Sequence, residues 1–157
     1  MKNTKTMGIM MAIALIAALL AGCAGEKEAV PVERFAEVIK DVGFEAPIDT
    51  TAPYSEAYEG VLKAVTASDE HGVTAHFFIF GDDHVETAFR TMKTQAEEQK
   101  GASCSAHSSS GKNYDIYTQK SDGIYFYIAR VEQTILVLAG PATQAEEIDG
   151  IAGGLGY

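Results

Sequence analysis

The sequence is poor in residues on which several classes of protein depend. None of its 157 residues is tryptophan and only two are cysteine, so no framework of disulfides can hold it together. Twelve basic residues stand against 22 acidic ones, which gives a formal net charge of -10. Because nucleic-acid binders neutralise phosphates with a basic surface, this balance argues against a nucleic-acid partner. The 46% of apolar residues is typical of one ordinary globular domain.

Long apolar runs are also scarce, and the one that stands out lies at the N-terminus. Lys2 and Lys5 precede a stretch from Met7 to Ala21 that contains no charged residue. A helix that crosses the hydrocarbon core of a membrane needs about 20 apolar residues. The shorter run is typical of the hydrophobic region of a signal peptide, so we expect a signal peptide rather than a membrane-spanning helix.

The residues after this run, Leu20-Ala21-Gly22-Cys23, resemble the lipobox of bacterial lipoproteins. The resemblance implies cleavage between Gly22 and Cys23 and a diacylglyceryl group on the Cys23 thiol. Two acyl chains hold a protein at a membrane, whereas a single chain binds only marginally. The expected location is therefore the bacterial cell envelope, where the lipid anchors the protein to a membrane and the domain faces outside the cytoplasm. An uncleaved anchor, or a chance match within an ordinary signal peptide, remains the alternative.

The chain divides into three parts on this interpretation. Residues 1–22 form the lipoprotein signal peptide. Residues 23–31 form the lipidated cysteine and a short tether, rich in small and charged residues and ended by Pro31. Residues 32–157 form a single domain.

Within that domain, apolar periodicity predicts both helices and strands. Helices are expected over 32–42, 83–100, where Asp83 and Glu86 have the spacing of a capping box, and 143–155. Strands are expected over 58–66, 73–80, 114–119, 124–131 and 134–139, and a Ser-rich exposed loop over 102–113. This order predicts an α+β fold, with a mostly antiparallel sheet of about five strands and helices packed on it.

Several short segments stand out within the domain: 78–82 entering a helix with Ala88-Phe89, then 111–114, 121–125, 130–131 and 155–157. These segments resemble those of a group of small uncharacterised bacterial lipoproteins. The resemblance implies no activity and no functional residue.

The residues themselves offer no convincing catalytic or metal site. Cys104 lies near His107 in the predicted loop, where flexible spacing does not enforce activation of the thiol. Asp82-Asp83-His84 could in principle bind a cation, but helix capping explains the aspartates as well. No nucleophile with a positioned base and no phosphate-binding motif is present. We therefore expect no catalytic residue, no metal and no cofactor.

Aromatic residues on the predicted sheet give the one candidate binding surface. Tyr125 and Tyr127 alternate with Ile124, Phe126 and Ile128, so the tyrosines could form an exposed binding face. Core packing of these rings is the alternative.

The sequence thus favours a membrane-tethered, non-catalytic binding or interaction module, whose partner is a protein or a small apolar ligand. A sensor or accessory subunit of a membrane complex is the first alternative. A hydrolase or thiol-redox enzyme with an unrecognised site is the second.

Overall fold

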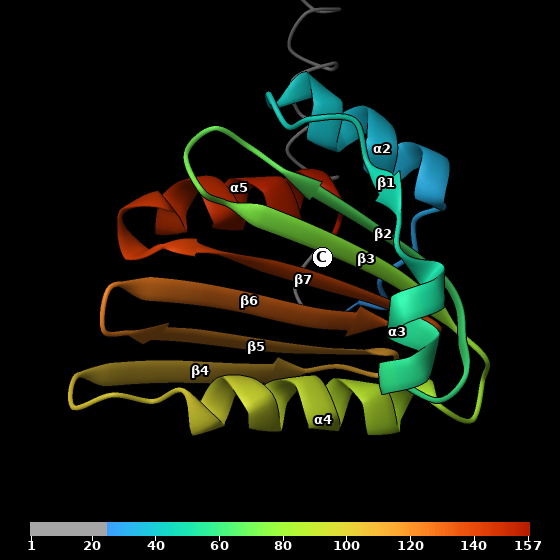
Figure 1. Cartoon of the computed structure of the whole chain (residues 1–157). Helices are drawn as coiled ribbons and strands as arrows, with labels where there is room; N and C mark the ends of the chain where they lie inside the picture. Colours follow the sequence, from blue (N-terminus) through green and yellow to red (C-terminus); the bar gives the residue numbers. More distant parts are fainter. Residues whose placement is uncertain (1–24) are drawn as a thin grey trace, which may run out of the picture.

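A computed structural model describes residues 25–157 of the chain and contains seven strands and four α-helices over that range (Figure 1). The helices are α2 (Val32–Asp41), α3 (Thr51–Ala57), α4 (Val85–Glu98) and α5 (Ala145–Gly154). The strands are β1 (Ile48–Asp49), β2 (Val61–Ser68), β3 (Thr74–Phe80), β4 (Cys104–Ser110), β5 (Tyr114–Ser121), β6 (Ile124–Val131) and β7 (Thr134–Pro141). The predicted α+β class is confirmed, while the predicted number of about five strands is wrong.

All the strands form one sheet in the order β1-β2-β3-β7-β6-β5-β4, and every neighbouring pair is antiparallel. Two-residue turns fix the register of the central hairpins. Asp122 and Gly123 have φ of 46° and 85°, as a tight hairpin turn between β5 and β6 requires. Glu132, with φ of 51°, begins the turn between β6 and β7, and Val131 pairs directly with Thr134. This turn contains no bulge.

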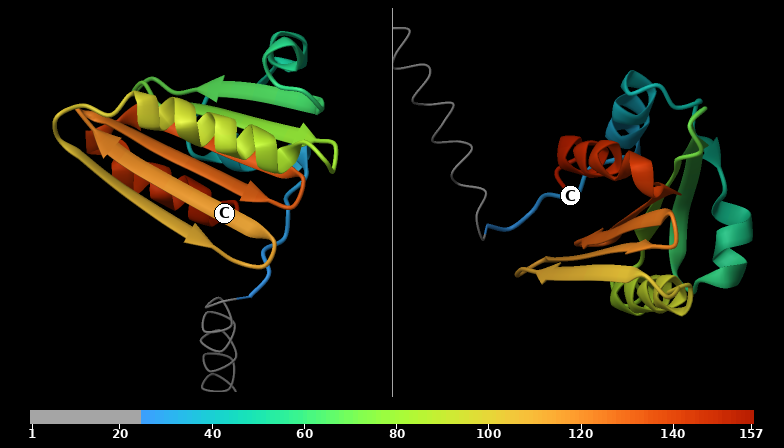
Figure 2. Two further views of the ribbon diagram at one scale, coloured as in Figure 1. Left: turned by 90° about the horizontal axis from the view of Figure 1, so that it is seen from below. Right: turned by 90° about the vertical axis from the view of Figure 1, so that its left-hand side faces the viewer.

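Alternate residues of the strands supply two separate cores. In β3, Phe77 packs into one core and Phe78 into the other, and both are buried. Because successive side chains of a strand point to opposite faces, a central strand that is apolar on both pleats must be covered on both sides. Helices cover both faces of the sheet, α2 and α5 on one and α3 and α4 on the other (Figure 2).

Helices α2 and α5 cover the first face, which we call the closed face. Phe35 of α2 stacks on Phe77 with ring centroids 5.1 Å apart. Ile148 of α5 is fully buried in the same cluster, and the C-terminal Tyr157 closes it. This face carries the larger of the two cores.

Helices α3 and α4 lie on the second face, which we call the open face (Figure 2). The long helix α4 buries Phe89 and Met92 against the sheet. Helix α3 has seven residues and none of them is buried. Most of the cover on this face therefore comes from α4.

Three elements were not expected from the sequence. Strand β4 occupies the predicted loop over 102–113, because its backbone pairs with β5 along its whole length while every side chain stays exposed. Strand β1 and helix α3 occupy a segment with no clear periodicity, and α3 takes in Tyr54, next to Pro53 in its first turn. Hydrogen bonding to a neighbour, rather than side-chain pattern, forms β1 and β4.

The segment before α2 packs against the domain. The backbone of Lys27 donates to the Asn113 side chain, and Asn113 donates back to the Lys27 carbonyl. The Lys27 ammonium reaches the Gly156 carbonyl and lies 5.3 Å from the centre of the Tyr114 ring. This part of the predicted tether is thus fixed on the closed-face side of the sheet. Across residues 25–157, no helix has the length and hydropathy needed to span a membrane.

Candidate binding pocket

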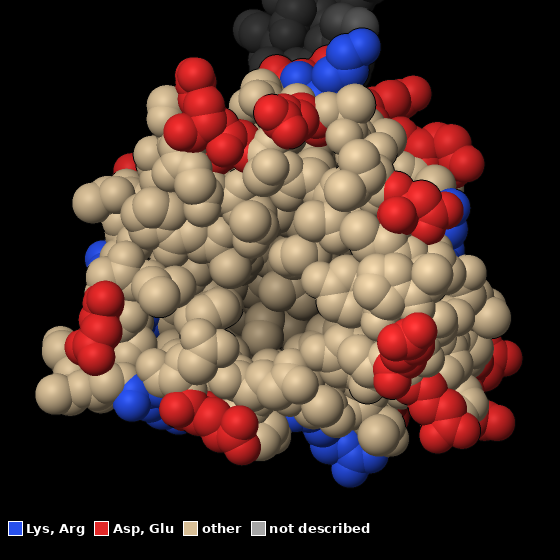
Figure 3. Space-filling model, viewed as in Figure 1, with Lys and Arg blue, Asp and Glu red and all other residues tan. Residues whose placement is uncertain are grey.

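A pocket of about 160 Å³ lies on the open face, between α3, α4 and the sheet. Figure 3 shows the hollow near the centre of this face, surrounded by uncharged side chains, with acidic and basic ones towards the rim. Among residues 25–157, no charged residue lines it. The lining residues are Tyr54, Tyr58, His76, Phe78, Met92, Gln95, Ala96, Gln99, Phe126, Ile128 and Val137.

One wall of the pocket is aromatic. The ring of Tyr54 meets the ring of Phe78 nearly edge-on, with centroids 4.9 Å apart and an interplanar angle of 84°. The centroid of the Tyr58 ring lies 6.3 Å from those of the Tyr54 and Phe78 rings. The centroids of the His76 and Tyr54 rings are 5.8 Å apart. Edge-to-face contacts at these distances stabilise aromatic clusters. The wall therefore holds its shape through contacts among its own rings.

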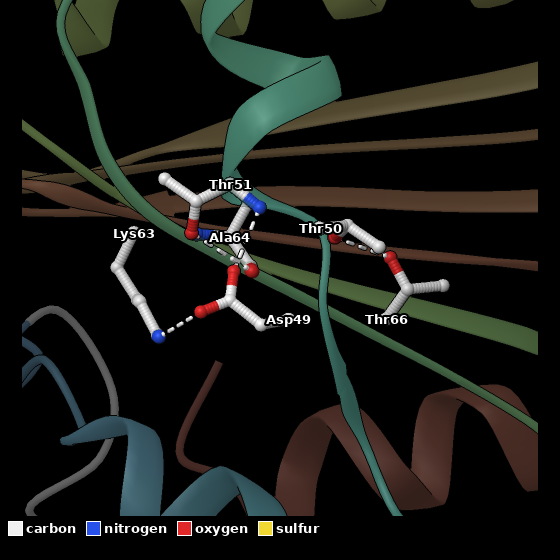
Figure 4. Close-up of polar contacts among 6 residues, drawn as sticks. All are labelled: Asp49, Thr50, Thr51, Lys63, Ala64 and Thr66. Atoms are coloured by element: carbon white, nitrogen blue, oxygen red, sulfur yellow. Dashed lines mark hydrogen bonds and ion pairs between the residues drawn. The ribbon is translucent and has the colours of Figure 1, made fainter.

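Helix α3 brings the two tyrosines to the sheet, and its first residues attach it to β2 (Figure 4). The Thr51 hydroxyl accepts from the Ala64 backbone N–H at 3.0 Å and donates to the Ala64 carbonyl at 3.3 Å. The Thr50 hydroxyl lies 3.0 Å from that of Thr66. Asp49 accepts from the Thr51 backbone N–H and pairs with Lys63. These polar contacts hold the N-terminal end of α3 on β2, and the contact between the Tyr54 and Phe78 rings adds to them.

His76 is the centre of the polar contacts behind the aromatic wall. The hydroxyls of Tyr54 and Thr66 each lie 3.0 Å from its Nδ1 atom. Burial lowers the pKa of His76, because an imidazolium would lose its hydration there. Burial also raises the pKa of both Tyr54 and Tyr58. The ionisable groups of the pocket are therefore neutral at neutral pH.

Two side-chain amides, from Gln95 of α4 and from Gln99 directly after it, lie on the opposite wall. Tyr58 donates its hydroxyl proton to Gln95 Oε1 at 2.7 Å, which links α3 to α4. Gln99 donates from Nε2 to the Gln95 carbonyl. An apolar cavity of about 150 Å³ can hold a benzene molecule. The pocket thus has the size for one ring, with amide and hydroxyl groups at its edge.

The predicted binding face formed by Tyr125 and Tyr127 needs correction. Their side chains are 8% and 7% exposed and belong to the core of the closed face. The Tyr125 hydroxyl donates to Asp149 of α5 at 2.7 Å. Burial raises the pKa of Tyr127 to about 12 and that of Tyr125 further. The helices cover this pleat, so Phe126 and Ile128, on the other pleat, line the pocket instead.

The other candidates from the sequence do not converge on a site. The predicted capping box is wrong: α4 begins at Val85, and neither Asp83 nor any other side chain caps it. Asp82 and Asp83 line a polar hollow of about 610 Å³ with Glu86, Arg90 and Arg130, among others. In the described part of the chain, no three histidine, cysteine or acidic side chains are placed to hold a metal ion.

Only one of the two cysteines lies within the described residues. Cys104 is an exposed free thiol at the start of β4, and its neighbour in the sequence pattern, His107, is exposed on the same strand. Cys23 and Gly22, the predicted lipidation and cleavage positions, lie outside the described residues.

Sequence reasoning missed most of the pocket. Tyr54 lies in a segment without periodicity, and Tyr58 is the first residue of the strand predicted over 58–66. His76, Phe78 and the α4 positions were expected on a strand and on a helix, but nothing in the pattern joins them. A tyrosine pair at a spacing of four residues, beside a threonine pair, was the signal available in the sequence for an amphipathic turn of helix.

Comparisons with known proteins do not identify a family. No protein-family model matches the chain, and a search of curated proteins finds no significant match. Among solved structures, the chain is similar to a GTP-binding regulator from Thermotoga maritima. That match has a TM-score of 0.49 and 9% identity, over 84% of this chain and 89% of the other. The likeness is too weak to indicate a ligand or an activity.

Proposed function

We propose that this protein is a membrane-tethered binding module outside the cytoplasm, which takes a small, neutral, largely apolar ligand into the pocket on its open face. The observation that carries the proposal is a pocket of about 160 Å³ without a charged lining residue. A charged ligand would lose its hydration there without gaining an ionic partner. A neutral ring can stack on the aromatic wall and keep a polar substituent at Gln95 or Gln99.

A non-catalytic role fits the electrostatics of the pocket. The Tyr54 hydroxyl lies 3.0 Å from His76 Nδ1, which is the distance expected of a nucleophile and its general base. Their pKa values do not fit that role. Catalysis would require a lowered tyrosine pKa or a strongly basic imidazole. Burial shifts both groups the other way, because it raises the Tyr54 pKa and lowers the His76 pKa.

The ligand class can be tested with fluorinated single-ring probes observed by ¹⁹F NMR. We expect 4-fluorophenol to bind the full-length protein in detergent, whereas 4-fluorobenzoate and 4-fluorobenzylamine, which carry charge, do not. Val137→Phe should weaken 4-fluorophenol binding by roughly tenfold, since the added ring occupies the pocket. Ile124→Phe is the matched control, because Ile124 lies on the neighbouring strand β6, is 44% exposed and does not line the pocket.

Two results would contradict the ligand proposal. One is equal binding of the neutral and the charged probes. The other is unchanged 4-fluorophenol binding in the Val137→Phe variant with its fold intact, as judged by circular dichroism.

The membrane attachment rests on Cys23 and has its own test. Cys23→Ser should abolish incorporation of labelled fatty acid and leave the precursor uncut, because no other residue near the cleavage point has a thiol. Cys104→Ser is the matched control and should be labelled normally. Normal processing of the Cys23→Ser protein would overturn the lipoprotein assignment.

A further inference from the structure

The two edges of the sheet are protected very differently. At one edge, β1 has only two residues, is followed at once by α3, and places the Asp49–Lys63 ion pair beside it. At the other edge, β4 has seven residues and all of them are exposed. Proteins usually protect a long edge strand with charges, proline or a bulge, because its free N–H and C=O groups can pair with another chain. The sequence of β4, CSAHSSS, has no charged residue and no proline, and its register with β5 is unbroken.

The hydrogen bonds around β4 show which of its backbone groups are free. The Gly111 N–H donates to the Tyr114 carbonyl, and the Asp122 N–H donates to the Ser103 carbonyl. Hydrogen-bonded and non-hydrogen-bonded pairs alternate along an antiparallel ladder, so these contacts set the phase for the residues between them. The odd-numbered residues of β4 bond to β5. The backbone groups of Cys104, Ala106, Ser108 and Ser110 therefore face outward.

We propose that β4 pairs with β4 of a second copy of this chain, across a two-fold axis at His107. In an antiparallel pair centred on His107, Cys104 lies opposite Ser110 of the other copy and Ala106 lies opposite Ser108. Only a register that matches even-numbered residues with even-numbered ones joins the outward groups, and among these the one centred on His107 pairs the whole strand. The strand is thus complementary to itself in its longest register.

The uncharged edge lowers the electrostatic cost of pairing with a second copy. Each copy carries a formal charge of -10, so two copies repel one another over most of their surfaces. The outer edge of β4 presents no charged side chain, which makes it a place where two acidic molecules can meet at little electrostatic cost.

The direction of the tether is compatible with this dimer. Lys27 contacts the Tyr114 ring on the closed-face side of the sheet. A two-fold axis perpendicular to the sheet keeps both closed faces on one side. Both tethers then leave towards the same side, and both pockets open towards the other. Because a single strand pair buries little surface, the raised local concentration of copies held on one membrane would favour the pairing. This point alone depends on the proposed lipid attachment.

Disulfide trapping tests the register. In a hydrogen-bonded antiparallel pair the Cα atoms are about 5.5 Å apart, within the range of a disulfide. Ser110→Cys should therefore join the native Cys104 of the second copy when membranes containing the full-length protein are oxidised with copper–phenanthroline. Within one copy these positions are about 20 Å apart along the strand, too far for a bridge. Ser109→Cys is the matched control and should give roughly tenfold less disulfide-linked dimer.

A proline variant tests the edge itself. Ser108→Pro removes an outward N–H and leaves the bonds to β5 in place, a substitution that edge strands tolerate. Added to Ser110→Cys, it should reduce the trapped dimer by roughly tenfold while the melting temperature stays close to that of the parent. His107→Asp places two carboxylates opposite each other at the axis and should have the same effect, whereas His107→Asn should not.

The outcomes separate cleanly. Equal trapping by Ser109→Cys and Ser110→Cys, or trapping that survives Ser108→Pro, would overturn the paired-edge dimer. Cross-links from the thiol introduced at position 110 to a different protein would also overturn it. Binding of 4-fluorophenol should be unchanged in every one of these folded variants, so failure of the dimer leaves the pocket proposal standing, and the reverse also holds.

Discussion

The closed and open faces belong to the same strands but differ in function: the closed face is a packed core, whereas the open face holds the pocket. On the closed face, α2 and α5 leave the central rings Phe35 and Phe77 fully buried. On the open face, α4 covers one part and the short α3 stands apart from it, joined by the Tyr58–Gln95 hydrogen bond. The gap between them is the pocket. The comparison teaches that a binding site can arise where helices leave a gap over an apolar sheet, without any catalytic motif.

Strand β6 shows this difference within neighbouring residues. Tyr125 and Tyr127 face α5 and are buried, while Phe126 between them is only partly buried and lines the pocket. A shift of one residue along the strand therefore changes the expected role of a ring from stability to binding.

The largest effect should come from removing a ring on the closed face. Tyr127→Ala should lower the free energy of unfolding by about 3–5 kcal/mol, because it leaves a cavity in a packed core. Phe126→Ala should cost about 1 kcal/mol, since its side chain is partly exposed, and should weaken 4-fluorophenol binding instead. Urea denaturation and ¹⁹F NMR on the two variants provide the measurements. Equal destabilisation by both would break the distinction between the faces.

A smaller effect should come from adding a methyl group. A Cβ at Gly140 would lie 2.9 Å from a methyl carbon of Val73 and 3.2 Å from the Val73 Cα, on the closed face. Gly140→Ala should therefore cost about 1–3 kcal/mol through overpacking.

Gly81, after β3 and beside α4, is the matched control. The nearest atom to a Cβ there would be 3.8 Å away, in the His84 ring. Gly81→Ala should leave stability unchanged or raise it by about 0.5 kcal/mol, because alanine restricts the unfolded chain. Thermal melts of both variants test this comparison. An unchanged melting temperature of Gly140→Ala would show that the side chains of the closed face can rearrange around an added methyl group.

The sequence allowed much of this arrangement to be predicted, but not which pleat of β6 stays exposed. The predicted strand over 73–80 carries apolar side chains on both faces, and β3 lies inside the sheet, between β2 and β7. In β6, both pleats carry aromatic or aliphatic side chains, so periodicity alone cannot say which of them a helix covers. The answer depends on where α5 and α4 pack, which is a property of the whole chain.

The pocket was harder to predict than the fold for a related reason. Its wall comes from α3, which forms through polar contacts of Thr50 and Thr51 with β2 rather than through an apolar stripe. Strand β4 escaped prediction because its partner is a backbone edge and its side chains carry no pattern.

The smallest expected effect is a pH dependence that belongs to the open face. Burial lowers the pKa of His76 below its ordinary 6.5. As the pH falls, His76 therefore takes up a proton in the unfolded chain before it does so in the folded protein. Stability should therefore be full above about pH 6.5, decline below it, and stop declining on this account once the pH is under the folded pKa.

The difference in melting temperature between the wild type and His76→Gln, followed from pH 7.5 to 4.5, isolates the contribution of His76 from that of the carboxylates. His71→Gln, in an exposed turn, is the control for the loss of a surface histidine. Since protonated His76 would place a charge beside the neutral pocket, 4-fluorophenol binding by the wild type should weaken over the same interval. Parallel curves for the wild type and His76→Gln would show that His76 tolerates its charge, and would remove the electrostatic argument for a neutral ligand.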